Sequence, residues 1–429
     1  MRKISLILLL SVLCVGMNAQ VQTHIYNERV RTLRVLRACD VDDAGQIRTM
    51  RPFLILKDGV VDGSEEDNTL HVSFDEMSHD VHFYTYTVRH MNADWAGESN
   101  ILTSEYLQGF TTMDITDYVH SINTSREYTH YEFLFPNPDM QLTLSGNYLL
   151  SIYEDGNPDK RVAEVQFCVV EPVTGVEGKV RSNTDIEFNG RYQQLDLDIN
   201  TTALSINDPN EIRVLVRQNN REDNSVWLTR PTFMERGHLR YQNNKSLIFE
   251  GGNEFHHFDA FSTYYAGTGI DRVYYEGGDY HVMLFPDEIG KGQYIHHHDA
   301  DGLFMVNAER TQDSDTQAEY MWVHWLLPTD KPWLDGSVYV SGELFENEFS
   351  MRNRMQYDPE AEAYWLTALV KQGGYDFQYL FAGKGTQNKT TTQRVDGSYW
   401  QTGNEYTVYV YWRPFGARYD RLVGIQTIR

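Results

Sequence analysis

Short runs in which apolar and polar side chains alternate recur along the whole chain, and they constrain its fold more than any other feature. Because successive side chains of a β-strand point to opposite faces of the sheet, this alternation predicts strands with one buried face. Val, Thr, Tyr and Phe dominate the runs, and these residue types fit a pleated, half-buried surface. Clear examples span residues 128–135, 211–218 and 407–412. We therefore predict an all-β protein.

Turns rich in Gly, Asp and Asn separate many of these runs, and such residues favour the backbone conformations that tight turns need. No long segment has the apolar spacing of a helix, and we expect only short helical turns around residues 101–110 and 114–118. Many short strands joined by such turns predict β-sandwich domains. The predicted turns span residues 57–59, 154–158, 250–253, 276–279 and 395–397.

The N-terminus has the layout of a cleaved export signal. Arg2 and Lys3 precede the apolar run 4–15, which is too short to cross a bilayer as a helix. Cleavage after Ala19 would remove residues 1–19. No later run reaches the ~18 consecutive apolar residues of a membrane-spanning helix. We therefore predict an exported protein with no direct membrane insertion.

Cysteine is scarce, with only 3 in 429 residues, so a disulfide-stapled scaffold is excluded. Cys14 follows bulky residues, which disfavours lipid attachment. Cys39 and Cys168 remain after the predicted cleavage. A bridge between these two thiols and a pair of buried free thiols are both open.

The chain is strongly acidic, with 61 Asp and Glu against 37 Lys and Arg and a formal net charge of -24. Binding to a phosphate backbone or to anionic lipid needs clustered basic side chains. We therefore predict no nucleic-acid partner. Hydrophobic residues make up 41% of the chain, which is enough to build several cores.

Two polar segments divide the chain. Residues 169–178 carry one proline and two glycines, and residues 309–319 lack large apolar side chains. We predict four parts: a signal peptide 1–19, an N-terminal sandwich 20–173, a middle sandwich 174–312 and a C-terminal sandwich 313–429.

Three polar clusters deserve comparison with metal sites. In 296–299 with Asp301, and in 256–257 with Asp259, consecutive histidines of an extended segment point to opposite sides, so exposed polar segments are the favoured interpretation. The alternating acids of 195–200 lack the glycine and glutamate of a calcium loop, which favours a solvated strand face. We predict no metal and no cofactor.

Recognised catalytic motifs are absent from the sequence: it contains no G-x-S-x-G, H-E-x-x-H, G-x-G-x-x-G or P-loop pattern. We predict no catalytic residue and no enzyme. Only the three-dimensional spacing of two carboxylates would reveal a glycoside hydrolase pair.

Residues 336–379 resemble the early-set immunoglobulin-like modules that accompany carbohydrate-active enzymes. This resemblance makes the predicted fold class all-β, with tandem immunoglobulin-like β-sandwich domains after a cleaved signal peptide. It also implies an alternative function, a secreted or periplasmic carbohydrate-binding protein in which exposed aromatic rings stack on sugars. The favoured interpretation of Trp365, Tyr375 and Tyr379 is that they are core or edge aromatics of an ordinary sandwich.

A set of ordered motifs covering nearly all of the mature chain resembles the plug protein family of the type 9 secretion system. One departure is Met91, where the family's H-C-N-A-D-W string has Cys. The motifs that carry the resemblance are H-M-N-A-D-W at 90–95, E-Y-L-Q-G-F at 105–110, Y-T-H-Y at 128–131, F-P-N at 135–137, S-G-N-Y-L-L at 145–150, Y-E-D-G at 153–156, V-V-E-P at 169–172, G-N-E-F at 252–255 and Y-E-G-G-D-Y at 275–280.

The resemblance implies a non-enzymatic periplasmic protein that binds and seals the periplasmic opening of a large outer-membrane β-barrel translocon. Its partner would be that barrel, and the barrel would hold it at the outer membrane. Within the H-M-N-A-D-W string we predict Asn92, Asp94 and Trp95 as candidate partner-binding residues. The competing interpretation, which we favour, is that Trp95 plugs the end of a sandwich while Asn92 and Asp94 fix a turn.

Overall fold

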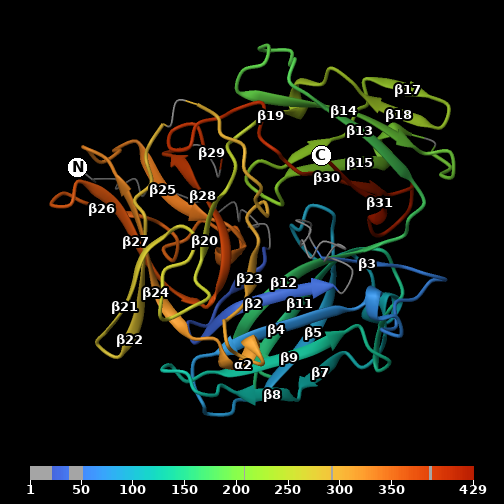
Figure 1. Cartoon of the computed structure of the whole chain (residues 1–429). Coiled ribbons are helices and arrows are strands. Elements are labelled where there is room, and N and C mark those ends of the chain that lie inside the picture. The colour runs from blue at the N-terminus through green and yellow to red at the C-terminus, as the bar shows by residue number, and fades with distance from the viewer. Residues whose placement is uncertain (1–21, 38–51, 207, 291–292, 386–388) are drawn as a thin grey trace, which may run out of the picture.

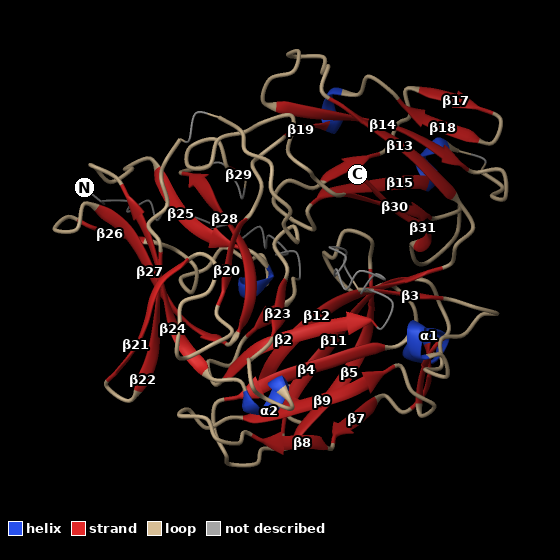
Figure 2. Ribbon diagram, in the orientation of Figure 1, coloured by secondary structure: helices blue, strands red, loops and turns tan. Residues whose placement is uncertain are grey.

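A computed structural model describes residues 22–37, 52–206, 208–290, 293–385 and 389–429. The predicted signal peptide 1–19 and Cys39 lie outside the described residues. Strands dominate every layer (Figure 2), and the helices α1 (Thr103–Tyr106) and α2 (Ser314–Gln317) each form a single turn. The prediction of an all-β protein is therefore confirmed. Within these residues, no helix has the length and apolar character needed to cross a membrane.

The first sandwich packs two sheets around one apolar core (Figure 1). One sheet has the order β1-β12-β11-β5-β7, with β3 parallel to β12, and the other has the order β2-β4-β9-β8. A small ladder joins β6 to β10. The strands are β1 (His24–Ile25), β2 (Val30–Arg37), β3 (Phe53–Ile55), β4 (Leu70–Glu76), β5 (Tyr84–Met91), β6 (Leu107–Gly109), β7 (Thr112–Ile115), β8 (Asp117–His120), β9 (Thr129–Phe135), β10 (Met140–Leu142), β11 (Gly146–Glu154) and β12 (Arg161–Val170).

Helical turns were expected at two places in this sandwich. The helix α1 lies within the first segment, 101–110. The expectation for 114–118 is wrong, because these residues belong to β7, which pairs with β5, and β8, which pairs with β9. The ladders that extend each sheet outweigh the local preference for a turn.

The second sandwich combines strands from the middle and from the last part of the chain. One sheet has the order β13-β14-β18-β17, with β19 also on β14, and the other has the order β16-β15-β30-β31. Leu, Ile and Val side chains of both sheets form its core. The strands are β13 (Gly175–Arg181), β14 (Tyr192–Asn200), β15 (Ile212–Gln218), β16 (Val226–Leu228), β17 (Phe233–Glu235), β18 (His238–Tyr241), β19 (Ile248–Glu250), β30 (Tyr406–Trp412) and β31 (Arg421–Ile428).

The third sandwich is built from β20 to β29 around a core rich in aromatic rings. The long strand β28 pairs with β20, β23, β25 and β29, and the facing sheet has the order β21-β22-β24-β27-β26. The strands are β20 (His256–Asp259), β21 (Ile270–Glu276), β22 (Asp279–Leu284), β23 (Phe304–Val306), β24 (Tyr320–Pro328), β25 (Gly336–Ser341), β26 (Gln356–Asp358), β27 (Ala363–Lys371), β28 (Gly373–Gly383) and β29 (Thr390–Thr391).

The predicted turn at 276–279 is confirmed, and its geometry explains its sequence. Glu276 pairs with Asp279, so only two residues connect β21 to β22. Both of these, Gly277 and Gly278, have positive φ values, 65° and 99°. Glycine adopts such values without the steric cost that a Cβ atom brings.

The strand pairing groups the chain differently from the predicted limits at 173 and 312. The third sandwich is inserted between β19 and β30 of the second. The two connecting segments lie against each other, because Tyr399 N donates to Gly252 O at 2.8 Å and Asn404 Nδ2 donates to Gly251 O at 2.7 Å. A Cβ atom at Gly251 would overlap the Tyr399 carbonyl, so this close approach requires glycine. The last strands pair across the insertion, which no local pattern in the sequence indicates.

Candidate functional site

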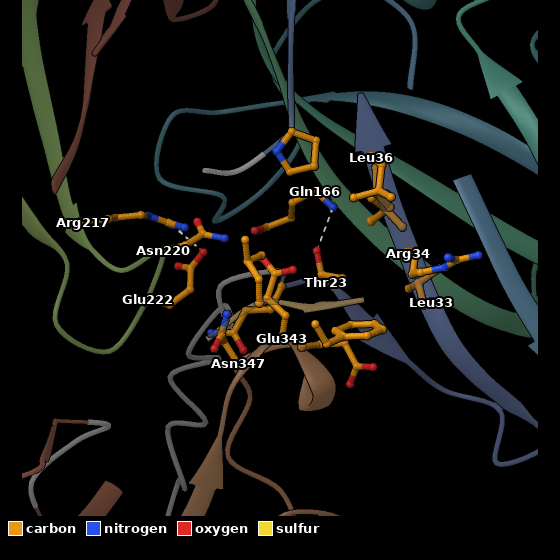
Figure 3. Close-up of a pocket in the computed structure, with 17 residues that line it drawn as sticks. Thr23, Leu33, Arg34, Leu36, Gln166, Arg217, Asn220, Glu222, Glu343 and Asn347 are labelled. Atoms are coloured by element: carbon orange, nitrogen blue, oxygen red, sulfur yellow. Dashed lines mark hydrogen bonds and ion pairs between the residues drawn. The ribbon is translucent and has the colours of Figure 1, made fainter. Parts of the chain in front are cut away.

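The three sandwiches meet pairwise in a triangular arrangement (Figure 1), and a small cavity lies where all three come together. The cavity has a volume of about 120 Å³. Its labelled lining residues come from every sandwich (Figure 3): Thr23 and Gln166 from the first, Arg217 and Glu222 from the second, and Glu343 and Asn347 from the third.

Trp95 lies in the apolar contact between the first and second sandwiches. Its side chain is fully buried, at 0% exposure, within a cluster that includes Leu149 of the first sandwich and Leu215 and Tyr411 of the second. Its backbone has a φ of 59°, in the left-handed region. A bulky residue held in this conformation needs strong support from its surroundings, and the cluster supplies it.

Hydrogen bonds show that the string 92–95 forms a tight turn. Trp95 N donates to Asn92 O at 3.0 Å, and Asp94 Oδ1 accepts from Ala96 N at 3.1 Å. The side-chain amide of Asn92 donates to Glu98 O at 3.1 Å. The interpretation of Asn92 and Asp94 as turn-forming residues is therefore confirmed.

Polar contacts tie this turn to the second sandwich. Ala93 N donates to Asp420 Oδ2 at 3.0 Å. Asn147 Nδ2 donates to Ala93 O at 3.0 Å, and Asn147 Oδ1 accepts from the Tyr411 hydroxyl at 2.8 Å. Cys168 is buried nearby, with its sulfur 3.4 Å from Asn147 Oδ1, and because Cys39 is not described, a bridge between these cysteines stays a prediction.

Direct contact of Asn92, Asp94 and Trp95 with a partner also stays a prediction. The structure places these three residues in one turn, but Trp95 is enclosed by two sandwiches. The Asp94 side chain is 45% exposed, with Arg213 of the second sandwich 4.0 Å away. Of the three, Trp95 is thus placed to join parts of this chain.

A buried ion pair joins the first sandwich to the third. Lys371 Nζ, at the end of β27, lies 2.5 Å from Asp75 Oδ2 on β4, and the side chains are 0% and 1% exposed. His130 Nδ1 lies 2.7 Å from Asp75 Oδ1, and the Tyr320 hydroxyl donates to Asp75 Oδ2 at 2.7 Å. Sequence reasoning missed this cluster because its residues are separated by up to 296 positions and share no motif.

The surroundings of Lys371 and Asp75 favour their charged forms. Burial alone would raise the pKa of Asp75, but Lys371 and His130 outweigh it and hold this pKa below its usual value. The ammonium also donates to Asp315 O at 2.6 Å and lies 4.3 Å from the centre of the Tyr128 ring. The pair is therefore satisfied on several sides, as a buried charge requires.

The other sequence candidates lie apart from these junctions. His296, His297 and His298 are exposed in an irregular segment. Across the described residues, no group of His, Cys, Asp or Glu has an arrangement that could hold a metal ion. Asp196 and Asp198 are 3.1 and 2.8 Å from the guanidinium groups of Arg181 and Arg240.

The aromatic residues considered for sugar stacking are mostly enclosed. Tyr375 and Tyr379 are 1% and 0% exposed in the core of the third sandwich, whereas Trp365 is 40% exposed. Stacking on a sugar ring requires an exposed face, so Tyr375 and Tyr379 are core residues in this fold.

His256 illustrates what the paired histidines do instead. Its Nδ1 lies 3.0 Å from Asp287 and its Nε2 lies 2.9 Å from Asp396, while the ring stacks on Phe377. Burial opposes the charged ring, but Asp396 and Asp287 outweigh it and raise the pKa of His256 to about 10. His256 therefore serves as a buried cation that joins loops of the third sandwich.

We expect the pH dependence of stability to report this charge. The folded-state pKa is above the ordinary value of 6.5, so the stabilisation is complete below pH 6.5 and is lost as the pH rises through about 10. His256→Gln should therefore flatten the decline in the free energy of unfolding across this range, measured by urea denaturation at a series of pH values. The control is His298→Gln, which alters an exposed histidine of the same sandwich. If His256→Gln keeps the slope of the unaltered protein, His256 is not charged in the fold.

Comparisons with known proteins complete the description of the site. The family described as type 9 secretion system plug protein 1st domain matches residues 60–171, which span most of the first sandwich. The crystal structure of a hypothetical protein from Parabacteroides merdae is similar with a TM-score of 0.89 and 36% sequence identity, covering 96% of this chain and 100% of that one. No curated protein matches the chain.

Proposed function

Because the chain belongs to the family of type 9 secretion system plug proteins, we propose that it is a non-enzymatic periplasmic component of that system. In this role it binds and seals the periplasmic opening of a large outer-membrane β-barrel translocon. It is held at the outer membrane by this protein partner and inserts no segment of its own into the bilayer.

The observation that carries the proposal is the way in which the three sandwiches are locked together. Each has its own core, and buried contacts around Trp95 and the Lys371–Asp75 pair connect the first sandwich to the other two. Protein interiors are packed like crystals and resist deformation. A broad body of this kind suits a seal, because a wide opening must be covered by something that does not bend when the membrane is under load.

The charge of the chain also bears on docking. A formal net charge of -24 favours association with a basic rim and accelerates the encounter, while shape complementarity sets the strength of binding. The proposal therefore includes a basic rim on the periplasmic side of the barrel, and association that weakens as salt increases.

Co-purification tests the seal directly. A tagged chain, extracted from detergent-solubilised outer membrane, should recover the barrel, and a tagged barrel should recover the chain; a tagged periplasmic protein of another family is the control. Deletion of the gene should raise the permeability of the outer membrane to a large antibiotic such as vancomycin. Recovery of the chain alone, together with unchanged permeability and secretion after deletion, would contradict the proposal.

A further inference from the structure

A cleft of about 730 Å³ separates the second and third sandwiches. Its volume falls in the range of ligand-binding sites, which is ~300–1,000 Å³. Residues of both sandwiches line it, including Glu405 and Arg429 of the second and Asp299 and Asp301 of the third. The cleft is distinct from the junctions around Trp95 and Lys371, and the seal proposed above does not use it.

The walls of the cleft carry an excess of negative charge. Glu254, Asp376 and Glu405 are buried there at 4%, 2% and 2% exposure. Burial raises the pKa of Asp301 to about 8, and Asp299 and Glu405 add to this shift. A cation placed among these carboxylates would relieve both their repulsion and their desolvation.

One cation of the chain already occupies this place. Arg429 Nε donates to Glu405 Oε1 at 2.5 Å, and the Arg429 side chain is 65% exposed while that of Glu405 is 3% exposed. The charge of Arg429 also lowers the pKa of Asp301. The guanidinium thus lies over buried carboxylates but is itself held loosely at the surface.

Two carboxylate oxygens of the cleft are left over. Glu405 Oε2 and Asp301 Oδ1 are buried, and neither accepts a hydrogen bond from any residue that the structure describes. A buried carboxylate oxygen without a donor is costly, so these atoms mark where further donors would be bound. Guanidinium, with five N–H groups in a planar fork, supplies more donors than a single contact with Arg429 uses.

We propose that the cleft binds an Arg or Lys side chain of a basic protein segment, which takes the place of Arg429 on Glu405. Phe304 and Trp400, both half-buried in the lining, offer apolar surface to the aliphatic part of such a side chain. A neutral sugar would leave the crowded negative charge uncompensated. The described residues also lack the ligand geometry of a metal site.

Titration calorimetry with short peptides tests the site. The probe is a pentapeptide with a central arginine between glycines, blocked at both ends, and the matched control peptide has citrulline, which is neutral and nearly the same shape. We expect the arginine peptide to bind the full-length protein with a Kd below about 1 mM and the citrulline peptide to bind about tenfold more weakly.

Variants should change the affinity in opposite directions. Glu405→Gln should weaken binding of the arginine peptide about tenfold, whereas Arg429→Ala should strengthen it several-fold because it removes the competing guanidinium. Asp271→Asn, which alters an exposed acid of the third sandwich, should leave the affinity unchanged.

A photo-crosslinking version of the arginine peptide keeps the test independent of any variant's folding. In the unaltered protein, crosslinks should map to the segments 294–305 and 400–405. Equal binding of arginine and citrulline peptides, no binding at about 1 mM, crosslinks elsewhere, or a sugar that binds at the cleft in place of the peptide would each overturn the proposal.

Discussion

Replacing Lys371 by methionine will lower the free energy of unfolding by about 3–5 kcal/mol, because it leaves Asp75 buried at the junction without the ammonium that balances it. The loss should be visible as a shift of the urea midpoint, followed by circular dichroism at neutral pH. The exposed pair Lys57–Glu65 provides the control. Lys57→Met should leave the midpoint almost unchanged, because exposed ion pairs contribute little.

Acid should reduce the difference between the Lys371→Met variant and the unaltered protein. The pKa of Asp75 is lowered in the folded state, so its stabilisation is present above the unfolded value of 3.8 and is lost as the pH falls through the folded value. The double change Lys371→Met with Asp75→Asn should recover part of the loss, since the remaining amide still accepts from Tyr320. A double variant as unstable as Lys371→Met alone would show that charge imbalance is not the cause.

Replacing Trp95 by alanine will also cost about 3–5 kcal/mol, since it opens a cavity where the first and second sandwiches meet. We expect the cut sites for a protease to appear between β12 and β13, where the chain passes from one sandwich to the other. Unfolding curves and limited proteolysis together measure the effect. Trp365→Ala, at a tryptophan with 40% exposure, should have a much smaller one.

The same variant separates the two roles considered for Trp95. If it acts within the chain, loss of stability and loss of barrel binding should appear together. If barrel binding falls while the unfolding curve stays the same, Trp95 contacts the partner directly, and the turn must open in the complex to expose it.

Features that depend on neighbouring residues could be predicted from the sequence. The alternation Tyr131, Phe133 and Phe135 predicted one face of β9, and these side chains lie in the core of the first sandwich. The turn between β21 and β22 followed from the chemistry of two consecutive glycines. Both depend on backbone geometry within a few residues, which periodicity and turn preference describe well.

Features that depend on distant pairing could not be predicted in the same way. β15 pairs with β30 although the whole third sandwich lies between them, and the partner of Asp75 is 296 positions away. An alternating strand specifies which face is buried but not which strand lies beside it. For the same reason the sequence indicated that residues 92–95 form a turn, but not that a second sandwich covers Trp95.

The insertion of one sandwich within another imposes an order on biogenesis. As the chain emerges with its N-terminus first, β15 has no neighbour on the side where β30 will lie until every residue of the inserted part has appeared. During that interval it exposes a row of unpaired amides and carbonyls, a template for aggregation. A ribosome or export channel that stalls before β30 would thus release a chain whose outer lobes are complete and whose middle is open. Holding factors in the envelope have their most urgent task at this late stage of synthesis.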